Sequence, residues 1–276
     1  MIHLENARLL ADLELFVVAT PDNQARFDLR PFGLVVADDA RFDPLRREAA
    51  PFLDRLARLD ALTFGAEGMP MPRWVFYDCA EIPGGIVGFG ARAATISSDV
   101  RALLEVPEGA EGIVPLSMYI AIPTLEPGVW MGHNLSTARR GLGGITKAVA
   151  LKVFRASAQI GVTQWDSAAL FVHTRMGPLE LLTAWTPAHS HAASLTYRVT
   201  IDDAALLRLA RVPSGEAVRP PADRWIDSGD HAAIEALQAR IEAGERFCVV
   251  GPPAPIGPGR WRVPIAALAR SRGAPR

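Results

Sequence analysis

The sequence predicts an α+β protein in which a mostly antiparallel sheet, curved or closed into a barrel, packs against a few helices. Apolar residues make up 49% of the chain and charged residues 21%, which is typical of a globular protein. Most predicted strands follow one another through short turns, which favours antiparallel pairing. We expect one globular domain over residues 1–276 with a frayed tail at 266–276, because no compositional break divides the chain.

Each predicted element rests on hydrophobic periodicity and on turn or capping residues. The predicted helices are 4–12, 44–62, 99–105, 142–157, 201–210 and 231–243. The predicted strands before the fourth helix are 13–19, 31–37, 74–82, 86–96, 113–123 and 128–135. A four-stranded meander is predicted between residues 160 and 199, and two short strands at 247–251 and 261–265.

Charge and composition argue against several classes of partner. The net charge is −1, so neither nucleic acid nor an anionic membrane surface is expected as a partner. The N-terminus lacks the order of a signal peptide, and no apolar run reaches the ~20 residues that a membrane span needs. Two cysteines are too few for a disulfide framework. We therefore expect a soluble, cytoplasmic protein that binds a small molecule, with no cofactor or metal and with homo-oligomers possible.

The two lysines of the chain, Lys147 and Lys152, both fall in the helix 142–157, whereas 27 residues are arginine. Lys152 falls within an apolar stripe of this helix and Lys147 on its other side, so the helix is apolar nearly all round. Burial lowers a lysine pKa, and a neutral amine can form a Schiff base with a carbonyl compound. Alternatively, both stems lie along apolar surface with the ammonium groups in water.

The segment before this helix predicts an anion site. Arg139, Arg140, Gly143 and Gly144 place cations and free backbone N–H groups at a helix N-terminus, which suits a carboxylate or a phosphate. Gly143 also leaves room one turn before Lys147. The alternative is that the glycines only form a tight turn.

A hairpin is predicted around residues 176–179, with Arg175 opposite Glu180 and His173 on the same polar face. Inside a barrel this face would supply a charge pair and a titratable imidazole to a cavity. Facing water, the same residues would form an ordinary cross-strand ion pair.

Two weaker patterns remain. His189 and His191 have the i, i+2 spacing that metal sites use, but no acidic ligand is nearby, and loop residues are the alternative. Trp130, Trp165 and Trp185 lie in predicted strands and could line an apolar pocket or pack in the core.

The order of elements over residues 73–200, with the helix sequence GGITKAVAL, resembles the acetoacetate decarboxylase-like superfamily. The resemblance implies a cone-shaped antiparallel barrel around a Schiff-base lysine, with Lys147 in that role. The family pattern has two adjacent lysines preceded by proline, whereas this chain has Lys147-Ala148 preceded by Thr146. These departures put the decarboxylase activity in more doubt than the fold.

Two functions of different classes follow. The first is a Schiff-base lyase acting on a keto acid, with Lys147 as nucleophile, Arg139 or Arg140 on the carboxylate, and Glu180 or His173 transferring protons. Arg175 and Trp165 would complete its substrate site. The second is a non-catalytic barrel that binds an apolar or aromatic small molecule through its tryptophans. A structural module without a pocket is a third possibility.

Overall fold

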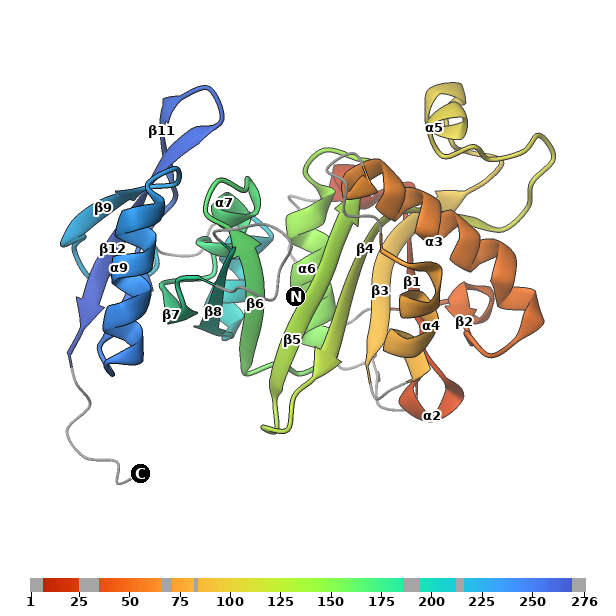
Figure 1. Cartoon of the computed structure of the whole chain (residues 1–276). Helices are drawn as coiled ribbons and strands as arrows, with labels where there is room; N and C mark the ends of the chain where they lie inside the picture. The colour runs from red at the N-terminus through yellow and green to blue at the C-terminus, as the bar shows by residue number, and fades with distance from the viewer. Residues whose placement is uncertain are drawn as a thin grey trace. The chain divides into compact units, whose positions relative to one another are not determined.

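The computed structural model describes residues 7–24, 35–65, 71–81, 84–185, 194–211 and 216–269. The chain divides into two compact units. Unit 1 comprises Met1–Ala156 and Ala210–Val212, and unit 2 comprises Ser157–Leu209 and Pro213–Arg276. Each unit combines a sheet with helices (Figure 1), so the predicted α+β class is confirmed.

The sheet of unit 1 has the strand order β5-β4-β3-β1-β2. Its strands are β1 (Glu14–Val18), β2 (Arg41–Phe42), β3 (Gly85–Arg92), β4 (Ile113–Pro123) and β5 (Val129–Thr137). All neighbouring strands are antiparallel except β1 and β2, which are parallel. β3 and β4 are buried along nearly their whole length, because helices cover both faces of the sheet.

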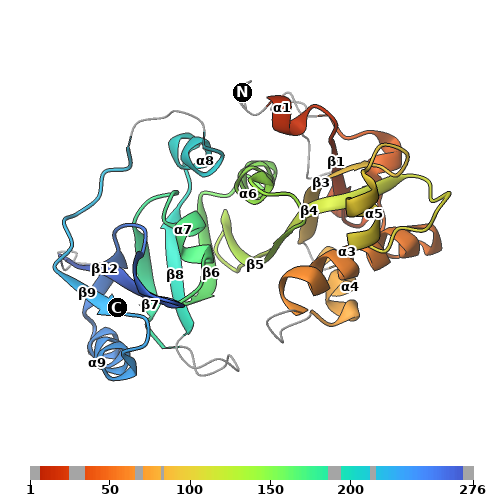
Figure 2. The same ribbon diagram turned by 90° about the horizontal axis from the view of Figure 1, so that it is seen from above.

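Helices α3 and α4 lie on one face of this sheet and α6 on the other (Figure 2). The helices of unit 1 are α1 (Ala7–Leu10), α2 (Pro21–Gln24), α3 (Ala50–Thr63), α4 (Arg73–Glu81), α5 (Ser98–Leu103) and α6 (Leu142–Val153), with short 3-10 turns η3 (Asp38–Ala40) and η4 (Arg47–Ala49). Phe52 of α3 contacts Phe16 of β1 and stacks on Phe42, with ring centroids 4.9 and 3.7 Å apart. These rings form the core on the α3 face.

The strand expected at 74–82 is wrong, since residues 74–81 belong to α4, and residue 82 lies outside the described residues. Val75, Phe76, Cys79 and Ala80 are buried at the i, i+1, i+4, i+5 spacing of a helix packed on a sheet. The aromatic and β-branched residues that favoured a strand are therefore accommodated on one helical face. Most of the strand expected at 31–37 lies outside the described residues.

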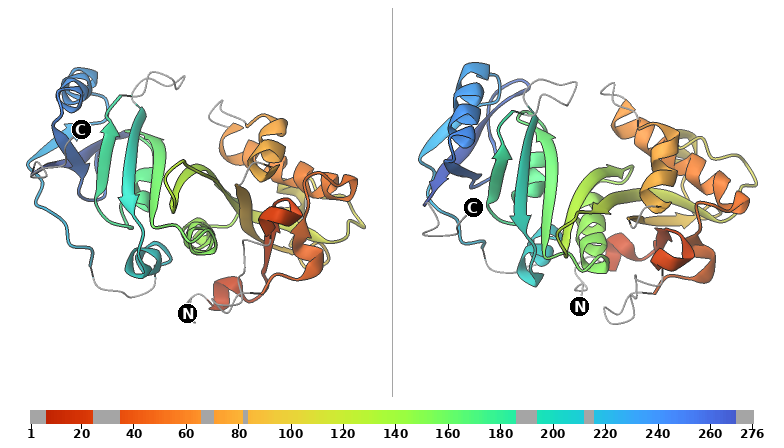
Figure 3. Two further views of the ribbon diagram at one scale, coloured as in Figure 1. Left: turned by 90° about the horizontal axis from the view of Figure 1, so that it is seen from below. Right: turned by 60° about the horizontal axis from the view of Figure 1, so that its bottom comes forward.

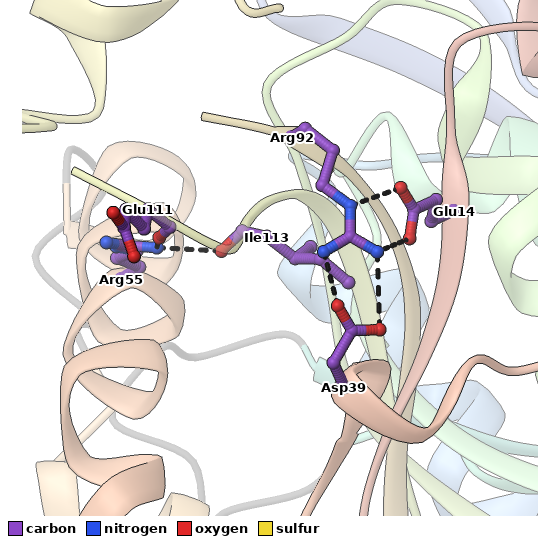
Figure 4. A network of polar contacts seen from close by, with 6 residues as sticks. All are labelled: Glu14, Asp39, Arg55, Arg92, Glu111 and Ile113. Atoms are coloured by element: carbon purple, nitrogen blue, oxygen red, sulfur yellow. Dashed lines mark hydrogen bonds and ion pairs between the residues drawn. The ribbon is translucent and has the colours of Figure 1, made fainter. Parts of the chain in front are cut away.

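An ion-pair network joins β1, η3 and β3 in unit 1 (Figure 4). Arg92 donates from Nε and Nη2 to the two carboxylate oxygens of Glu14, at 2.5 and 2.6 Å, and from Nη1 to Asp39 at 2.5 Å. The guanidinium holds the pKa of the Asp39 carboxyl below its usual value. The network fixes β1 and the η3 turn to the end of β3.

The sheet of unit 2 has the order β6-β8-β7-β10-β12-β11, with β9 also paired to β12. Its strands are β6 (Ala158–Gln164), β7 (Leu179–Thr183), β8 (Ser194–Thr200), β9 (Arg224–Asp227), β10 (Arg246–Val249), β11 (Ala254–Gly257) and β12 (Arg260–Leu268). All of these pairs are antiparallel. β12 runs through residues 266–268 of the expected frayed tail, and residues 270–276 lie outside the described residues.

The helices of unit 2 among the described residues are α7 (Ala169–His173), α8 (Asp203–Leu209) and α9 (His231–Glu242). α9 packs against β7 and β9 (Figure 3), and Gln238 of α9 accepts a hydrogen bond from Ala184 N–H at 2.7 Å. Arg240 of α9 lies over the ring of Phe247 in β10, at 4.7 Å from its centroid. α9 therefore covers the face of the sheet to which Phe247 points.

The predicted closed barrel is wrong for each unit, because the strand order in each is open-ended over the described residues. The turns between strands do give antiparallel pairing, but helices cover the sheet faces in place of ring closure. Within the described part of the chain, none of the helices has the length and apolar character needed to cross a membrane.

Candidate functional site

Lys147 is buried between α6 and the sheet of unit 1, with 1% of its surface exposed. Its Nζ lies 5.5 Å from the centroid of the Tyr119 ring in β4. Burial without a neighbouring carboxylate lowers the pKa of Lys147 to about 7. The Tyr119 hydroxyl is also buried and has no hydrogen-bond partner among the described residues. An amine and a phenol thus share one apolar layer.

Thr146, the residue before Lys147, fixes the helix to the sheet. Its Oγ1 donates to the Leu142 carbonyl at 3.0 Å and lies 2.6 Å from the hydroxyl of Ser117 in β4. Ser117 Oγ in turn accepts from the Phe89 N–H of β3 at 3.3 Å. The position of Lys147 is therefore set by a buried hydrogen-bond chain that crosses α6, β4 and β3.

The two lysines of α6 differ in environment. Lys152, which the helical pattern placed among the apolar residues, is only half-buried, whereas Lys147 is fully buried. The reason is that both sides of the helix contribute to packing, against β3, β4 and β5. Periodicity within the helix could not show which of its apolar sides faces the sheet.

The turn that joins β5 to α6 is held by side-chain and backbone hydrogen bonds. Thr137, the last residue of β5, donates from Oγ1 to the Arg139 carbonyl at 2.9 Å and accepts from Arg139 N–H at 3.2 Å. Leu142 N–H donates to the Arg139 carbonyl at 3.2 Å. Gly141 at the N-cap of α6 has φ of 88°, a conformation that favours glycine. These hydrogen bonds fix the conformation of the turn.

The first turn of α6 presents backbone N–H groups without a capping side chain, because its N-cap is Gly141. The first turn contains no acidic residue, and Gly143 and Gly144 are partly exposed. Arg140 is exposed and Arg139 half-buried just before the helix. The structure thus brings Arg139, Arg140, Gly143 and Gly144 together at one helix N-terminus, as the sequence predicted.

The opposite face of the same sheet carries a buried carboxylate that the sequence did not reveal. Asp60 of α3 is 1% exposed and accepts hydrogen bonds from Asn134 Nδ2 of β5 and from Met71 N–H, the latter at 2.7 Å. Burial raises the pKa of Asp60 above 3.8, although these hydrogen bonds oppose the increase. Asp60 and Asn134 are 74 residues apart, so only folding brings them together.

A second buried polar group lies in unit 2. His173 of α7 has Nδ1 2.8 Å from the hydroxyl of Tyr197 in β8, and Gln159 Nε2 of β6 donates to the same hydroxyl at 3.4 Å. Gly161 leaves the space that the Tyr197 hydroxyl fills, since a Cβ there would overlap it. His173 therefore packs in the core of unit 2, whereas Lys147 belongs to unit 1.

The predicted hairpin with His173 and Arg175 in a strand is wrong, because residues 169–173 form α7. The Ser167 hydroxyl accepts from Ala169 N–H at 3.1 Å and starts this helix. Glu180 pairs with Arg246 of β10 at 2.8 Å, and the Arg175 carbonyl accepts from Arg208 Nε at 3.2 Å. The structure does not place Glu180 opposite Arg175.

Trp165 is a core residue of unit 2, 1% exposed, with Nε1 donating to the Ala184 carbonyl at 2.8 Å. Trp130, in unit 1, stacks on Phe154 with centroids 4.5 Å apart. The tryptophans expected to line one ligand cavity are thus divided between the two units, and the alternative of a non-catalytic barrel gains no support. His189 and His191 lie outside the described residues, and the described residues hold no cluster of three metal-ligating side chains.

Comparison with solved structures gave similar structures at low sequence identity. Two structures of the CoA-dependent acyl-homoserine lactone synthase BjaI, one with SAM and isopentyl-CoA and one with MTA, are similar to this chain with TM-scores of 0.42 and 0.41. Each covers 81% of this chain and 99% of the other, at 10% and 11% sequence identity. No family model and no curated protein matches the chain. A likeness of this size does not assign an activity.

The expected resemblance to the acetoacetate decarboxylase-like superfamily is wrong. The structures returned belong to another class of enzyme, and neither unit contains the closed barrel that the resemblance implies. The expected function, a Schiff-base lyase that acts on a keto acid, is therefore wrong as well. The proton-transfer residues expected beside Lys147 lie in unit 2, with His173 bound to Tyr197 and Glu180 to Arg246.

Proposed function

We propose that unit 1 binds the diphosphate of a small-molecule group carrier at the N-terminus of α6, and that the chain is a transferase using that carrier. The observation that carries this proposal is the hydrogen-bonded turn from Thr137 to Gly141 that leads from β5 into α6. The amides of the first turn of α6 have no side-chain cap, and Arg139 and Arg140 come directly before this helix. Ligands of this class include nucleotides and coenzyme A thioesters.

Electrostatics favour an anion at this position. The N-terminal end of a helix carries a partial positive charge, and its free N–H groups donate directly to phosphate oxygens. Arg139 and Arg140 add two guanidinium groups, each able to contact phosphate through two N–H groups. A diphosphate has enough oxygens to use both the amides and the arginines.

The absence of bulky side chains at the helix start supports close approach by the ligand. Gly143 has ordinary van der Waals space on the β5 side, where a Cβ would lie 3.6 Å from Leu135 and from Thr137. Packing against the sheet therefore does not require a glycine at position 143. Proteins bind diphosphate-linked carriers in order to use the group at the far end, which is the reason for inferring a transferase.

The test is calorimetric titration of the protein with acetyl-CoA, ADP and inorganic pyrophosphate. Arg139→Gln and Arg140→Gln should each weaken binding about tenfold, as loss of a charge-assisted hydrogen bond predicts. Arg155→Gln is the matched control, because it removes an exposed guanidinium at the other end of α6. Binding should also weaken as salt is added.

The three ligands distinguish recognition of the diphosphate from recognition of the whole carrier. Binding of all three identifies the diphosphate as the recognised group, and release of free CoA from acetyl-CoA in the presence of amines supports acyl transfer. Titrations in which none of the ligands binds, or in which Arg139→Gln and Arg140→Gln behave like Arg155→Gln, would exclude the proposed site.

A further inference from the structure

Unit 2 contains a cavity of about 500 Å³, a size within the range of small-molecule sites. Its floor is one face of the sheet. Glu180 of β7 is in register with Arg198 of β8 and with Cys248 of β10, so these three side chains point to the same side. Phe247, next to Cys248, points to the opposite face that α9 covers. The cavity is therefore on the side of the sheet away from α9.

The walls of the cavity come from separate segments of unit 2. Arg208 of α8, the turn at residues 176–178 and the loop residues 216–218 all line the cavity. Asp202, at the start of α8, and Leu268 of β12 complete the lining. The cavity thus has a fixed floor of three strands and walls from a helix and two loops.

Arg208 is held rigidly at this cavity without an ion-pair partner in the described part of the chain. Its Nε donates to the Arg175 carbonyl at 3.2 Å and its Nη2 to the Met176 carbonyl at 2.7 Å. Arginine has five N–H donors, so others remain for a ligand. Two effects lower the pKa of the Arg219 guanidinium, namely burial, which is the larger, and the positive charge of Arg208 nearby. Two neighbouring guanidiniums favour an anionic group here.

Carboxylates line the same cavity. Glu180 is neutralised by Arg246, at 2.8 Å. Asp202 accepts from Ala205 N–H at 2.6 Å with one oxygen, and Glu216 is an exposed residue of the lining. Neither carboxylate forms a salt bridge with a described residue, although the charge of Glu216 acts on the Arg219 guanidinium nearby. A ligand that carries only negative charge would be repelled by these two groups, whereas an ammonium group would be attracted.

We propose that this cavity binds a small zwitterion, an amino acid or a related compound, with its carboxylate on Arg208 and its ammonium group toward Glu216 and Asp202. The rigid guanidinium provides planar recognition of a carboxylate. The mixture of both charge signs within one cavity selects against simple acids and simple amines. All the residues that line this cavity belong to unit 2, whereas the diphosphate site is proposed on residues of unit 1.

The experiment is a binding titration of the full chain, by calorimetry or ligand-observed NMR, with a spacing series of glycine, β-alanine, γ-aminobutyrate and 6-aminohexanoate. Acetate, hexanoate and hexylamine are the singly charged controls. We expect at least one zwitterion to bind about tenfold more tightly than the acid or amine of matched length, because each lost charged contact costs roughly 1.4 kcal/mol or more.

Three variants assign the contacts. Arg208→Lys should weaken the best zwitterion about tenfold, because lysine keeps the charge but loses planar recognition. Glu216→Gln should weaken the zwitterion but not the acid, and its exposed side chain makes it safe for folding. Arg262→Gln, an exposed arginine of β12 outside the cavity lining, should change nothing.

The proposal is overturned if no zwitterion binds with a dissociation constant below about 10 mM. It is also overturned if acids or amines bind as well as the zwitterions do. Equal binding by wild type, Arg208→Lys and Glu216→Gln would place the ligand elsewhere and overturn it in the same way. Hydrogen exchange of each variant confirms that unit 2 is folded.

Discussion

Replacing Lys147 by methionine should stabilise the protein, and by an amount that depends on pH. Methionine keeps a long apolar side chain in the layer between α6 and β4 but removes the amine. The pKa of Lys147 falls from 10.5 to about 7 through burial alone. At 1.36 kcal/mol per pKa unit, this difference corresponds to a cost of about 5 kcal/mol for burying the charged form.

The sign of the effect follows from proton linkage. Below pH 7 the amine is protonated in both states, so the folded protein bears the full cost of the buried charge. Between pH 7 and 10.5 only the unfolded chain binds this proton, and wild-type stability rises with pH at about 1.4 kcal/mol per unit. Above 10.5 the amine is neutral in both states and the cost disappears.

The assay is urea unfolding of wild type and Lys147→Met between about pH 6 and about pH 11, followed by circular dichroism, with the difference in unfolding free energy plotted against pH. The gain from Lys147→Met should reach up to about 5 kcal/mol at acid pH and decline toward zero in alkali. Lys152→Met is the matched control on the same helix. Its side chain is half-buried, and we expect a change below about 1 kcal/mol.

A gain that does not vary with pH would refute the reasoning, because it would mean that the Lys147 amine has the same protonation in the folded and unfolded states. A loss of stability at every pH would also refute it. That result would show that the amine makes a favourable polar contact in the core.

Two further predictions concern buried polar groups and close packing. Asp60→Ala should lower the unfolding free energy by about 3 kcal/mol, because Asn134 Nδ2 and Met71 N–H lose their acceptor inside the protein. The control is Asp54→Ala, at an exposed position of α3. Equal midpoints of denaturant unfolding for the two variants would contradict a structural role of Asp60. Gly161→Ala should cost about 1–3 kcal/mol because the new Cβ overlaps the Tyr197 hydroxyl, whereas Gly257→Ala meets no atom within 4 Å and should be neutral in the same denaturation assay. Unchanged stability of Gly161→Ala would mean that the contact of Tyr197 with His173 is not rigid.

Several features followed from local sequence alone. The α+β class, the antiparallel pairing of β4 with β5 and the glycine-led start of α6 are each set by residues close together in the chain. Alternating apolar residues define a strand, and a glycine that adopts positive φ ends one element and permits the next. The position of Arg139 and Arg140 just before the start of α6 belongs to this group.

Other features required tertiary structure. Residues 74–81 and 169–173 form helices because their apolar side chains pack on one face against a sheet, and short apolar runs do not distinguish helix from strand. The burial of Lys147 in preference to Lys152 depends on which side of α6 meets β4.

The contacts that define the candidate sites are long-range. Asp60 meets Asn134, and Glu180 meets Arg246, across 74 and 66 residues of chain. Whether the sheets close or stay open also depends on the strand order, which the sequence pattern leaves undetermined. Local propensity therefore determined the elements, and the packing of distant segments decided which charges are buried, paired or left facing a ligand.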